Sequence, residues 1–327
     1  AQGPKKNVGK NIPLPPVSEE EGQRRPKGLA DDDQYALSID VNLVELDVVV
    51  TDGRGNPISG LVKEHFTITE DKVKQTITNF SPTDSPMTVV LLIEFGDTFG
   101  YYYDDVVRPA AGFINSLREE DWAAVVAYDI RPTILADFTQ NREELFGGLR
   151  RLRFPAYRET SLFDAVAFTL ERMGNIDGKK AIFLLSTGFD TISKKSYGQV
   201  LKMAEGSDTM IYSVGMAQLY RTMYEDRMGG LQRISFLQAE NVLRSLANAS
   251  GGTYFFPRFQ GEYRGIYETV SANMRNQYSL GFVPTNQDKD GKLHKIKVEV
   301  PRLDVNGDGK PDKLKVRHKK GYYARPN

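Results

Sequence analysis

The stretch Met87-Thr-Val-Val-Leu-Leu-Ile-Glu94 decides the fold, because it is an almost unbroken run of β-branched and leucine residues. A strand that is buried on both faces of a parallel sheet has this composition, whereas a half-exposed strand alternates apolar and polar residues. From here to residue 276, short apolar runs alternate with segments whose apolar residues recur three and four positions apart. This alternation of strands and helices predicts a doubly wound α/β domain over residues 86–276.

Both flanks of this stretch show the alternation that is typical of half-exposed antiparallel strands. Before it, residues 36–85 contain a long strand and a hairpin that turns at Glu70-Asp71. After it, the predicted strands are Gln277–Val283, Lys292–Val300 and Leu314–Tyr323. A three-stranded sheet cannot bury a face alone, so we predict one small discontinuous antiparallel β-sandwich of residues 36–85 and 277–327, with the α/β domain inserted into it. Residues 1–35 are rich in Pro, Gly and charge, which indicates a flexible N-terminal arm.

Composition excludes several classes of function. The 327 residues include 43 Lys and Arg and 43 Asp and Glu, and this balance argues against a nucleic-acid partner. No apolar run reaches the roughly 18–20 residues of a membrane span. The absence of cysteine excludes disulfides, thiol catalysis and thiolate metal sites.

The first residues, Ala1-Gln2-Gly3, contain neither Met nor a hydrophobic leader. Signal peptidase leaves small residues at the start of a mature chain, so this beginning fits a protein exported after signal-peptide removal. A shortened chain would begin in the same way. We expect an extracytoplasmic location, in the periplasm, at the cell surface or secreted.

Residues 89–99, VVLLIEFGDTF, resemble the first strand and metal loop of von Willebrand factor A domains. The flanking segments VNLVELDVVVTDGRGNPISGL, GGTYFF and QYSLGFVP look like the acidobacterial-type von Willebrand factor A-related family. The resemblance extends over about residues 38–325, judged from the order and spacing of these segments. It implies a Rossmann-like sheet and an exported protein, usually of unassigned function.

The resemblance also implies the position of a metal-ion-dependent adhesion site. Such domains hold Mg²⁺ with an Asp-x-Ser-x-Ser loop, a Thr from a second loop and an Asp from a third. The corresponding residues in this chain are Glu94, Gly96, Thr98, Thr160 and Thr187. One hydroxyl and one carboxylate are missing from this set, and Mg²⁺ demands near-ideal octahedral oxygen ligands, so we expect a degenerate site that binds Mg²⁺ poorly.

A second pattern favours calcium. Residues 304–312, DVNGDGKPD, place carboxylate or amide oxygens at positions 1, 3, 5 and 9, a glycine at position 6 and a backbone carbonyl at position 7. The flanking segments read as strands, so the loop resembles the calcium loops of β-hairpins and not a helical EF-hand. A polar turn that only faces water is the alternative. The candidate ligands are Asp304, Asn306, Asp308, Lys310 through its carbonyl, and Asp312.

Two stretches are candidates for partner binding. Three tyrosines follow the degenerate metal loop, and the segment Ala217–Phe236 is longer than the 2–6 residues that usually connect a strand and a helix. Tyr, Met and Arg are enriched at the centres of interfaces, although the same residues also pack locally. The residues concerned are Tyr101, Tyr102, Tyr103, Tyr220, Met223 and Tyr224.

The sequence carries no recognisable catalytic motif, and its three histidines have no partner nearby in the chain. We therefore expect a non-enzymatic protein that binds another protein or assembles with itself, as an interaction or structural subunit. The alternative is a divalent-metal-dependent adhesion or ligand-binding receptor, in which Glu94, Thr98 and Thr160 do hold Mg²⁺.

Overall fold

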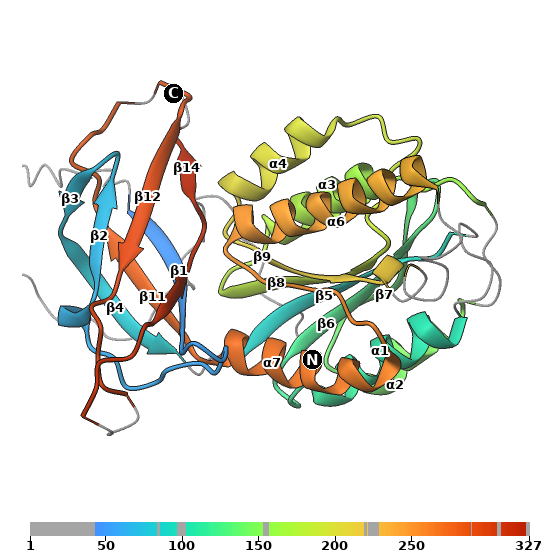
Figure 1. The fold of residues 1–327 in the computed structure, drawn as a ribbon, viewed down its shortest axis with the longest axis horizontal. Coiled ribbons are helices and arrows are strands. Elements are labelled where there is room, and N and C mark those ends of the chain that lie inside the picture. Colours follow the sequence, from blue (N-terminus) through green and yellow to red (C-terminus); the bar gives the residue numbers. More distant parts are fainter. Residues whose placement is uncertain are drawn as a thin grey trace, which may run out of the picture.

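The computed structural model describes residues 43–83, 86–96, 103–152, 157–218, 221, 229–288, 290–305 and 309–324. Within them the chain forms an α/β part and a β-sandwich that lie side by side, with the sandwich on the left of Figure 1.

A six-stranded sheet is the middle layer of the α/β part, with the strand order β10-β9-β8-β5-β6-β7. The strands are parallel except β7, which pairs antiparallel with β6. The chain enters at the centre with β5, continues outward through β6 and β7, and returns to the other side of β5 with β8, so the strand order reverses between β5 and β8. Their bounds are β5 Met87–Glu94, β6 Trp122–Tyr128, β7 Pro132–Thr139, β8 Lys179–Ser186, β9 Met210–Gly215 and β10 Tyr254–Phe255.

Helices cover both faces of this sheet (Figure 1). One face carries α1 (Tyr103–Ser116), α2 (Arg142–Leu149) and α7 (Tyr263–Arg275), and the other carries α3 (Leu162–Met173), α4 (Tyr197–Gly206) and α6 (Gly230–Ser250). Each face has its own apolar core, because every residue of β5 and β8 is buried and successive side chains point to opposite faces. The predicted α/β fold with a parallel core is confirmed.

The β-sandwich consists of two four-stranded sheets, β13-β1-β11-β4 and β14-β12-β2-β3. Antiparallel pairing of β1 with β11 joins the segment before the α/β part to the segment after it, so the sandwich is discontinuous, as predicted. Val49 of β1 packs in the apolar core of the α/β part and links the two parts. The strands are β1 Val44–Thr51, β2 Thr67–Glu70, β3 Val73–Gln75, β4 Ile77–Thr83, β11 Gln277–Phe282, β12 Leu293–Glu299, β13 Lys315–Arg317 and β14 Gly321–Tyr323, and the short 3₁₀ turns are Lys63–His65 and Gln260–Glu262.

The hairpin expected at Glu70-Asp71 is present, and Asp71 and Lys72 both have positive φ, at 46° and 72°. A turn of this kind requires left-handed backbone at both central residues, because its twist must match that of the strands.

The prediction of one strand over Leu314–Tyr323 is wrong. The segment forms β13 in one sheet and β14 in the other, and the chain crosses between the sheets at residues 318–320. The crossing packs against the end of α6: a Cβ on Gly251 would lie 2.5 Å from the carbonyl carbon of His318.

The three- and four-residue spacing of apolar residues predicts a helix over Ala239–Ala249, but the helix that forms, α6, already begins at Gly230. The unusual connection that was predicted over Ala217–Phe236 therefore ends in the first turns of this helix. None of the described helices is long and apolar enough to cross a lipid bilayer.

Candidate functional site

The point where the strand order reverses is the first place to look for a site, because the loops that follow the two central strands separate there and leave a crevice. Glu94 is the last residue of β5, and Ser186 is the last residue of β8. Thr187 follows Ser186, and Tyr128 ends the neighbouring strand β6. The strand ends thus bring one carboxylate and three hydroxyl groups together.

Glu94 is buried, and both of its carboxylate oxygens accept hydrogen bonds. Oε1 accepts from the Thr187 hydroxyl at 2.7 Å. Oε2 accepts from the Thr187 backbone N–H at 2.8 Å, from the Ser186 hydroxyl at 2.8 Å and from the Tyr128 hydroxyl at 3.2 Å. The result is a closed polar network between three strand ends.

Electrostatics agree with this closed arrangement. Burial raises the pKa of Glu94, whereas the hydrogen bonds from Thr187, Ser186 and Tyr128 act in the opposite direction and stabilise the carboxylate. Burial and the nearby Glu94 charge raise the pKa of Tyr128, so its hydroxyl stays protonated and can donate.

The loop after β8 is held by the same network. Oγ of Ser186 accepts from the N–H of Gly188 at 2.9 Å. Gly188 has a φ of 85°, and a Cβ there would lie 2.4 Å from the carbonyl oxygen of Ala239 in α6. The loop is therefore pressed against α6, and the ring of Phe189 meets that of Phe236 edge-on at 5.3 Å.

Thr160 is not part of the Glu94 network. Its hydroxyl donates to the carbonyl oxygen of Phe189 at 2.9 Å, and its own N–H donates to the Thr191 hydroxyl at 2.8 Å. Asp190, another carboxylate of this region, accepts from the N–H of Phe163 at the start of α3. These hydrogen bonds stabilise the loops, and they occupy the hydroxyl and the N–H of Thr160 with partners inside the protein.

Among the other residues predicted for the adhesion site and for partner binding, Gly96 is half-buried in the segment after β5. Tyr103 begins α1, but its side chain lies outside the described part of the structure. The remaining residues, Thr98, Tyr101, Tyr102, Tyr220, Met223 and Tyr224, also lie outside the described residues.

This donor set does not fit a bound Mg²⁺, because both oxygens of Glu94 already accept hydrogen bonds and the Thr160 hydroxyl is bound elsewhere. Within the described residues, no three His, Asp or Glu side chains form a group that could hold a metal ion. Sequence reasoning identified Glu94 and Thr187 but missed Ser186 and Tyr128, although both end buried strands of the parallel sheet.

The proposed calcium loop is only partly described. The N–H of Gly309 donates to Oδ2 of Asp304 at 2.8 Å, which brings the first and sixth loop positions together. Gly309 has a φ of 81°, a sharp turn that glycine permits. The N–H of Asp312 donates to the carbonyl of Leu303 at 2.8 Å and closes the loop. Asn306 and Asp308 lie outside the described residues, and Oδ2 of Asp312 accepts a hydrogen bond from the N–H of Val305 at 3.2 Å.

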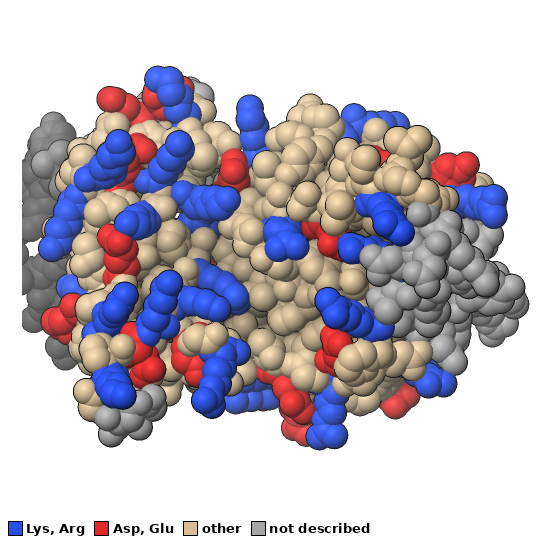
Figure 2. Space-filling model, in the orientation of Figure 1, with Lys and Arg blue, Asp and Glu red and all other residues tan. Residues whose placement is uncertain are grey.

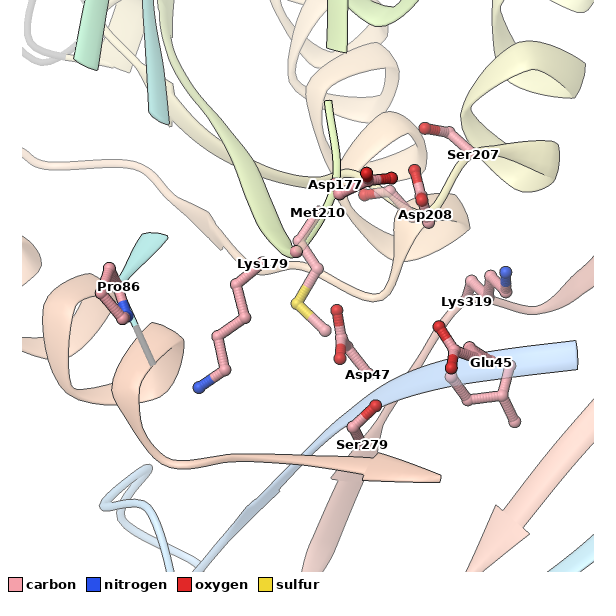
Figure 3. A pocket seen from close by; sticks show the side chains of 13 residues that line it. Glu45, Asp47, Pro86, Asp177, Lys179, Ser207, Asp208, Met210, Ser279 and Lys319 are labelled. Atoms are coloured by element: carbon pink, nitrogen blue, oxygen red, sulfur yellow. The ribbon is translucent and has the colours of Figure 1, made fainter. Parts of the chain in front are cut away.

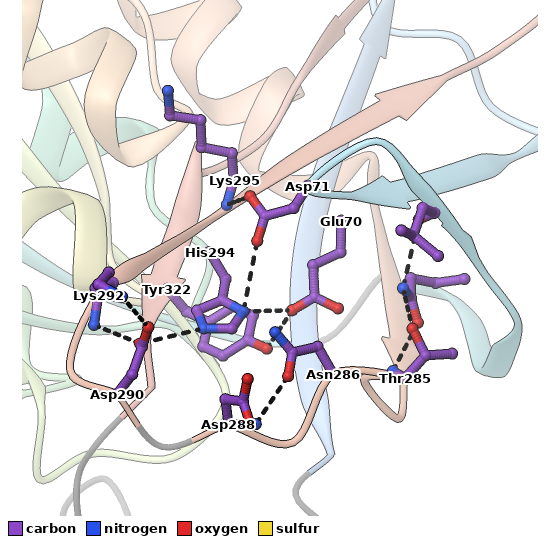
Figure 4. A network of polar contacts seen from close by, with 12 residues as sticks. Glu70, Asp71, Thr285, Asn286, Asp288, Asp290, Lys292, His294, Lys295 and Tyr322 are labelled. Atoms are coloured by element: carbon purple, nitrogen blue, oxygen red, sulfur yellow. Dashed lines mark hydrogen bonds and ion pairs between the residues drawn. The ribbon is translucent and has the colours of Figure 1, made fainter.

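A second polar network, which the sequence did not suggest, lies inside the sandwich (Figure 4). Nδ1 of His294 is 3.1 Å from Oε1 of Glu70, and the hydroxyl of Tyr322 donates to the same oxygen at 2.5 Å. The rings of His294 and Tyr322 stack at 5.2 Å. Oδ1 of Asp290 lies 3.7 Å from Nε2 of His294. Glu70 and His294 are buried and Tyr322 is half-buried. The three groups come from β2, β12 and β14, so the network ties these strands together.

The solvent-facing side of α6 carries large aliphatic side chains, which is unusual for a helix on a protein surface. Leu231, Ile234 and Leu237 lie in its first turns and are 83%, 51% and 47% exposed. Phe236 and Ala239, on the inner side of the same turns, are buried. On the face shown in Figure 2, Lys and Arg crowd the sandwich, whereas the surface over α4 and the visible length of α6 is largely uncharged. On this face the basic side chains are therefore unevenly distributed.

No protein-family model matches the sequence, and no curated protein is similar to it at a significant level. Solved structures with a similar fold include the hypothetical protein BatB from Bacteroides thetaiotaomicron, which is 13% identical over 57% of this chain and 98% of that chain, with a TM-score of 0.41. A von Willebrand factor type A protein from Catenulispora acidiphila is 12% identical over 86% of this chain and 74% of that chain, with a TM-score of 0.45. The von Willebrand factor domain of the type V pili tip protein Mfa5 from Porphyromonas gingivalis is 14% identical over 58% of this chain and 95% of that chain, with a TM-score of 0.39. At these identities the similarity concerns the fold alone.

Proposed function

We propose that this chain is a non-enzymatic interaction subunit that binds a protein partner through the outer side of the first turns of α6. The observation that carries the proposal is the row of three exposed aliphatic residues, Leu231, Ile234 and Leu237. The partner is a second copy of this chain or another protein.

The geometry of the helix explains why this row is informative. A helix turns by about 100° per residue, so the three exposed residues centre on the side opposite to Phe236, Ala239 and Leu243. A helix on a protein surface normally carries polar residues on its outer side. Burying one leucine or isoleucine side chain contributes roughly 1.5–3 kcal/mol, so three of them offer a substantial gain to a partner that covers them.

The Glu94 network supports binding without a bridging cation. A metal-dependent receptor needs free oxygen ligands at the carboxyl ends of the strands, but Glu94 accepts hydrogen bonds from Thr187, Ser186 and Tyr128. The same network fixes the loop that packs under α6, so it positions the proposed contact surface from below. For this reason we favour the metal-independent interaction over the adhesion receptor.

Calcium has a separate place in the proposal. Asp304, Asn306, Asp308, the carbonyl of Lys310 and Asp312 would hold one ion in the hairpin loop of the sandwich. The ion would supply charge neutralisation for the carboxylates and would stiffen the loop. The hydrogen bond from Gly309 to Asp304 supports this proposal, because it places the Asp304 carboxylate on the inner side of the turn. The proposal keeps the extracytoplasmic location that the resemblance implies.

Sedimentation velocity over a concentration series tests the simplest form, in which the partner is a second copy. We expect wild-type protein to self-associate, and the variant Leu231→Ser/Ile234→Ser/Leu237→Ser to remain monomeric. The matched control is Val62→Ser/Val73→Ser/Phe259→Ser, which removes three exposed apolar side chains elsewhere. Equal association of all three proteins would show that α6 is not the contact surface, and a monomeric wild type would exclude self-association.

A further inference from the structure

A cavity of about 320 Å³ lies between the sandwich and the α/β part, at the amino ends of β8 and β9. Figure 3 shows carboxyl groups facing it from both parts. It is at the opposite end of the sheet from Glu94 and from the first turns of α6. Its lining includes Glu45 and Asp47 from β1, Asp177 before β8, Asp208 before β9 and Lys319 from the crossing between β13 and β14. Pockets of roughly 300 Å³ and larger are those in which proteins bind small molecules.

Asp47 is the central charged group of this cavity. It is half-buried, and burial raises its pKa to about 6 although the charges of Lys179 and Lys319 act in the opposite direction. Within the described part of the chain, neither a hydrogen bond nor an ion pair within 4.0 Å joins the Asp47 carboxylate to another residue. A carboxylate that is partly removed from water and has no direct partner is unfavourable by itself.

The lysines near Asp47 do not neutralise it directly. Lys179 extends away from Asp47 in Figure 3, and its Nζ lies 3.4 Å from the carbonyl oxygens of Met274 and Arg275. Lys180 pairs with Asp208 at 2.7 Å. Lys319 is half-buried, and burial lowers its pKa. With Asp208 paired to Lys180, the cavity is lined by three further carboxylates, Glu45, Asp47 and Asp177, against the two ammonium groups of Lys179 and Lys319. The cavity therefore favours a cation.

The residues that line the cavity favour an organic ammonium group over a metal ion. The described residues contain no group of three His, Asp or Glu side chains that could hold a metal ion, so the geometry is unsuited to a divalent metal. Hydroxyl groups of Ser207 and Ser279 add hydrogen-bonding capacity, and Leu46 and Met210 add apolar surface. An ammonium group donates three hydrogen bonds, and an alkyl stem packs on apolar side chains.

We propose that this cavity binds a primary alkylammonium group, with the Asp47 carboxylate accepting its charge. Two sources carry this group: a free aliphatic diamine and the lysine side chain of a protein. The site would join the two parts of the molecule through a ligand that both of them contact. It is independent of the interaction surface proposed for α6.

Isothermal titration calorimetry on the whole chain tests the proposal with two probes, 1,4-diaminobutane and Nα-acetyl-lysine amide. The uncharged probes 1,4-butanediol and Nα-acetyl-norleucine amide control for apolar contacts. We expect saturable binding of at least one charged probe and of neither uncharged one. Binding of the diamine alone assigns a free amine as the ligand, and binding of the lysine amide assigns a protein side chain.

The variant Asp47→Asn is nearly isosteric and removes only the charge. Loss of a hydrogen bond between charged groups should weaken binding at least about tenfold. Glu64→Gln makes the same change of charge at an exposed residue that does not line the cavity, and it should bind as wild type does. Absence of binding of both charged probes, or equal affinities of wild type and Asp47→Asn, would overturn the proposal. Thermal unfolding of both variants verifies that they fold.

Discussion

Thr187 binds both oxygens of Glu94: its hydroxyl donates to Oε1 at 2.7 Å and its backbone N–H donates to Oε2 at 2.8 Å. This relationship joins the ends of β5 and β8 at the point where the strand order reverses. In a doubly wound sheet this point is usually an open crevice for ligands. Here the crevice contains a buried acid whose hydrogen bonds all come from within the protein among the described residues, and the loop after β8 is fixed as a consequence.

Replacing Thr187 by Val should destabilise the protein by about 1–3 kcal/mol, because Oε1 of a buried carboxylate loses its hydroxyl donor. Thr187→Ser keeps the hydroxyl and should lose much less. Urea unfolding monitored by circular dichroism gives both values. If Thr187→Val were as stable as Thr187→Ser, the hydrogen bond from the Thr187 hydroxyl to Glu94 would contribute nothing to stability.

Gly188→Ala tests the packing of the loop against α6. The new Cβ would lie 2.4 Å from the Ala239 carbonyl oxygen, and φ is 85°, so we expect a loss of roughly 3 kcal/mol or more from strain and displacement of the helix. Gly178→Ala is a matched control, because its φ is 86° but no atom lies within 4 Å of the new Cβ. It should cost only about 1–2 kcal/mol for the left-handed backbone. Equal losses in the two variants would contradict close packing at Gly188.

The stability of the chain should depend on pH through Asp47. Its pKa is about 6 in the folded protein against an ordinary value of 3.8 for aspartate, so the folded state holds this proton more tightly. Stability contributed by protonated Asp47 is therefore lost as the pH rises from about 4 through 6. Glu45, Lys179, Asp208 and Lys319 also act on this carboxyl, and their effects are contained in the raised value.

The comparison with Asp47→Asn isolates this contribution. At pH 7 the variant should be more stable than wild type by roughly 1–2 kcal/mol, after allowance for the partial exposure of Asp47. The difference should shrink as the pH falls to about 4. Urea unfolding at a series of pH values measures it, and a difference that is independent of pH would show that Asp47 titrates normally.

Calcium should raise the midpoint of thermal unfolding if the loop of residues 304–312 binds it. A ligand that binds only the folded state stabilises it by about 2.7 kcal/mol at roughly 100 times its Kd. The shift should disappear in Asp304→Ala and persist in Asp288→Ala, which removes a carboxylate from a different loop of the sandwich. Magnesium at the same concentration should have a smaller effect, since Mg²⁺ demands near-ideal octahedral geometry and gives up its bound waters reluctantly. A calcium shift that survives Asp304→Ala would place the ion elsewhere.

The central sheet can be predicted well from the sequence, because a strand that is buried on both faces is a continuous run of apolar residues. Val89, Leu91 and Ile93 pack on one face of β5, and Val90 and Leu92 pack on the other, so the run has no polar interruption before Glu94. The half-exposed strands of the sandwich can be predicted for a similar reason, because their apolar and polar residues alternate along the chain.

The resemblance places Thr187 in the same site as Glu94, but the other two partners, Tyr128 and Ser186, could not be predicted, because they lie 34 and 92 residues further along the chain. Only the strand order brings them together. The start of α6 was missed for another reason: Leu231, Ile234 and Leu237 lie on the outside, so the apolar pattern there does not resemble that of a helix with one buried side. These three exposed residues are the ones that form the proposed contact surface.

Site-specific photo-crosslinking at residue 234 shows whether a protein partner covers the exposed side of α6 without a bridging cation. A photoreactive amino acid replaces Ile234 in the whole chain, with the exposed Lys202 of α4 as the control position, and native extract is irradiated with and without EDTA. We expect one protein adduct of defined mass at position 234, equal in both conditions and absent at position 202. An adduct that requires divalent cations, or labelling at position 234 no stronger than at position 202, would contradict it.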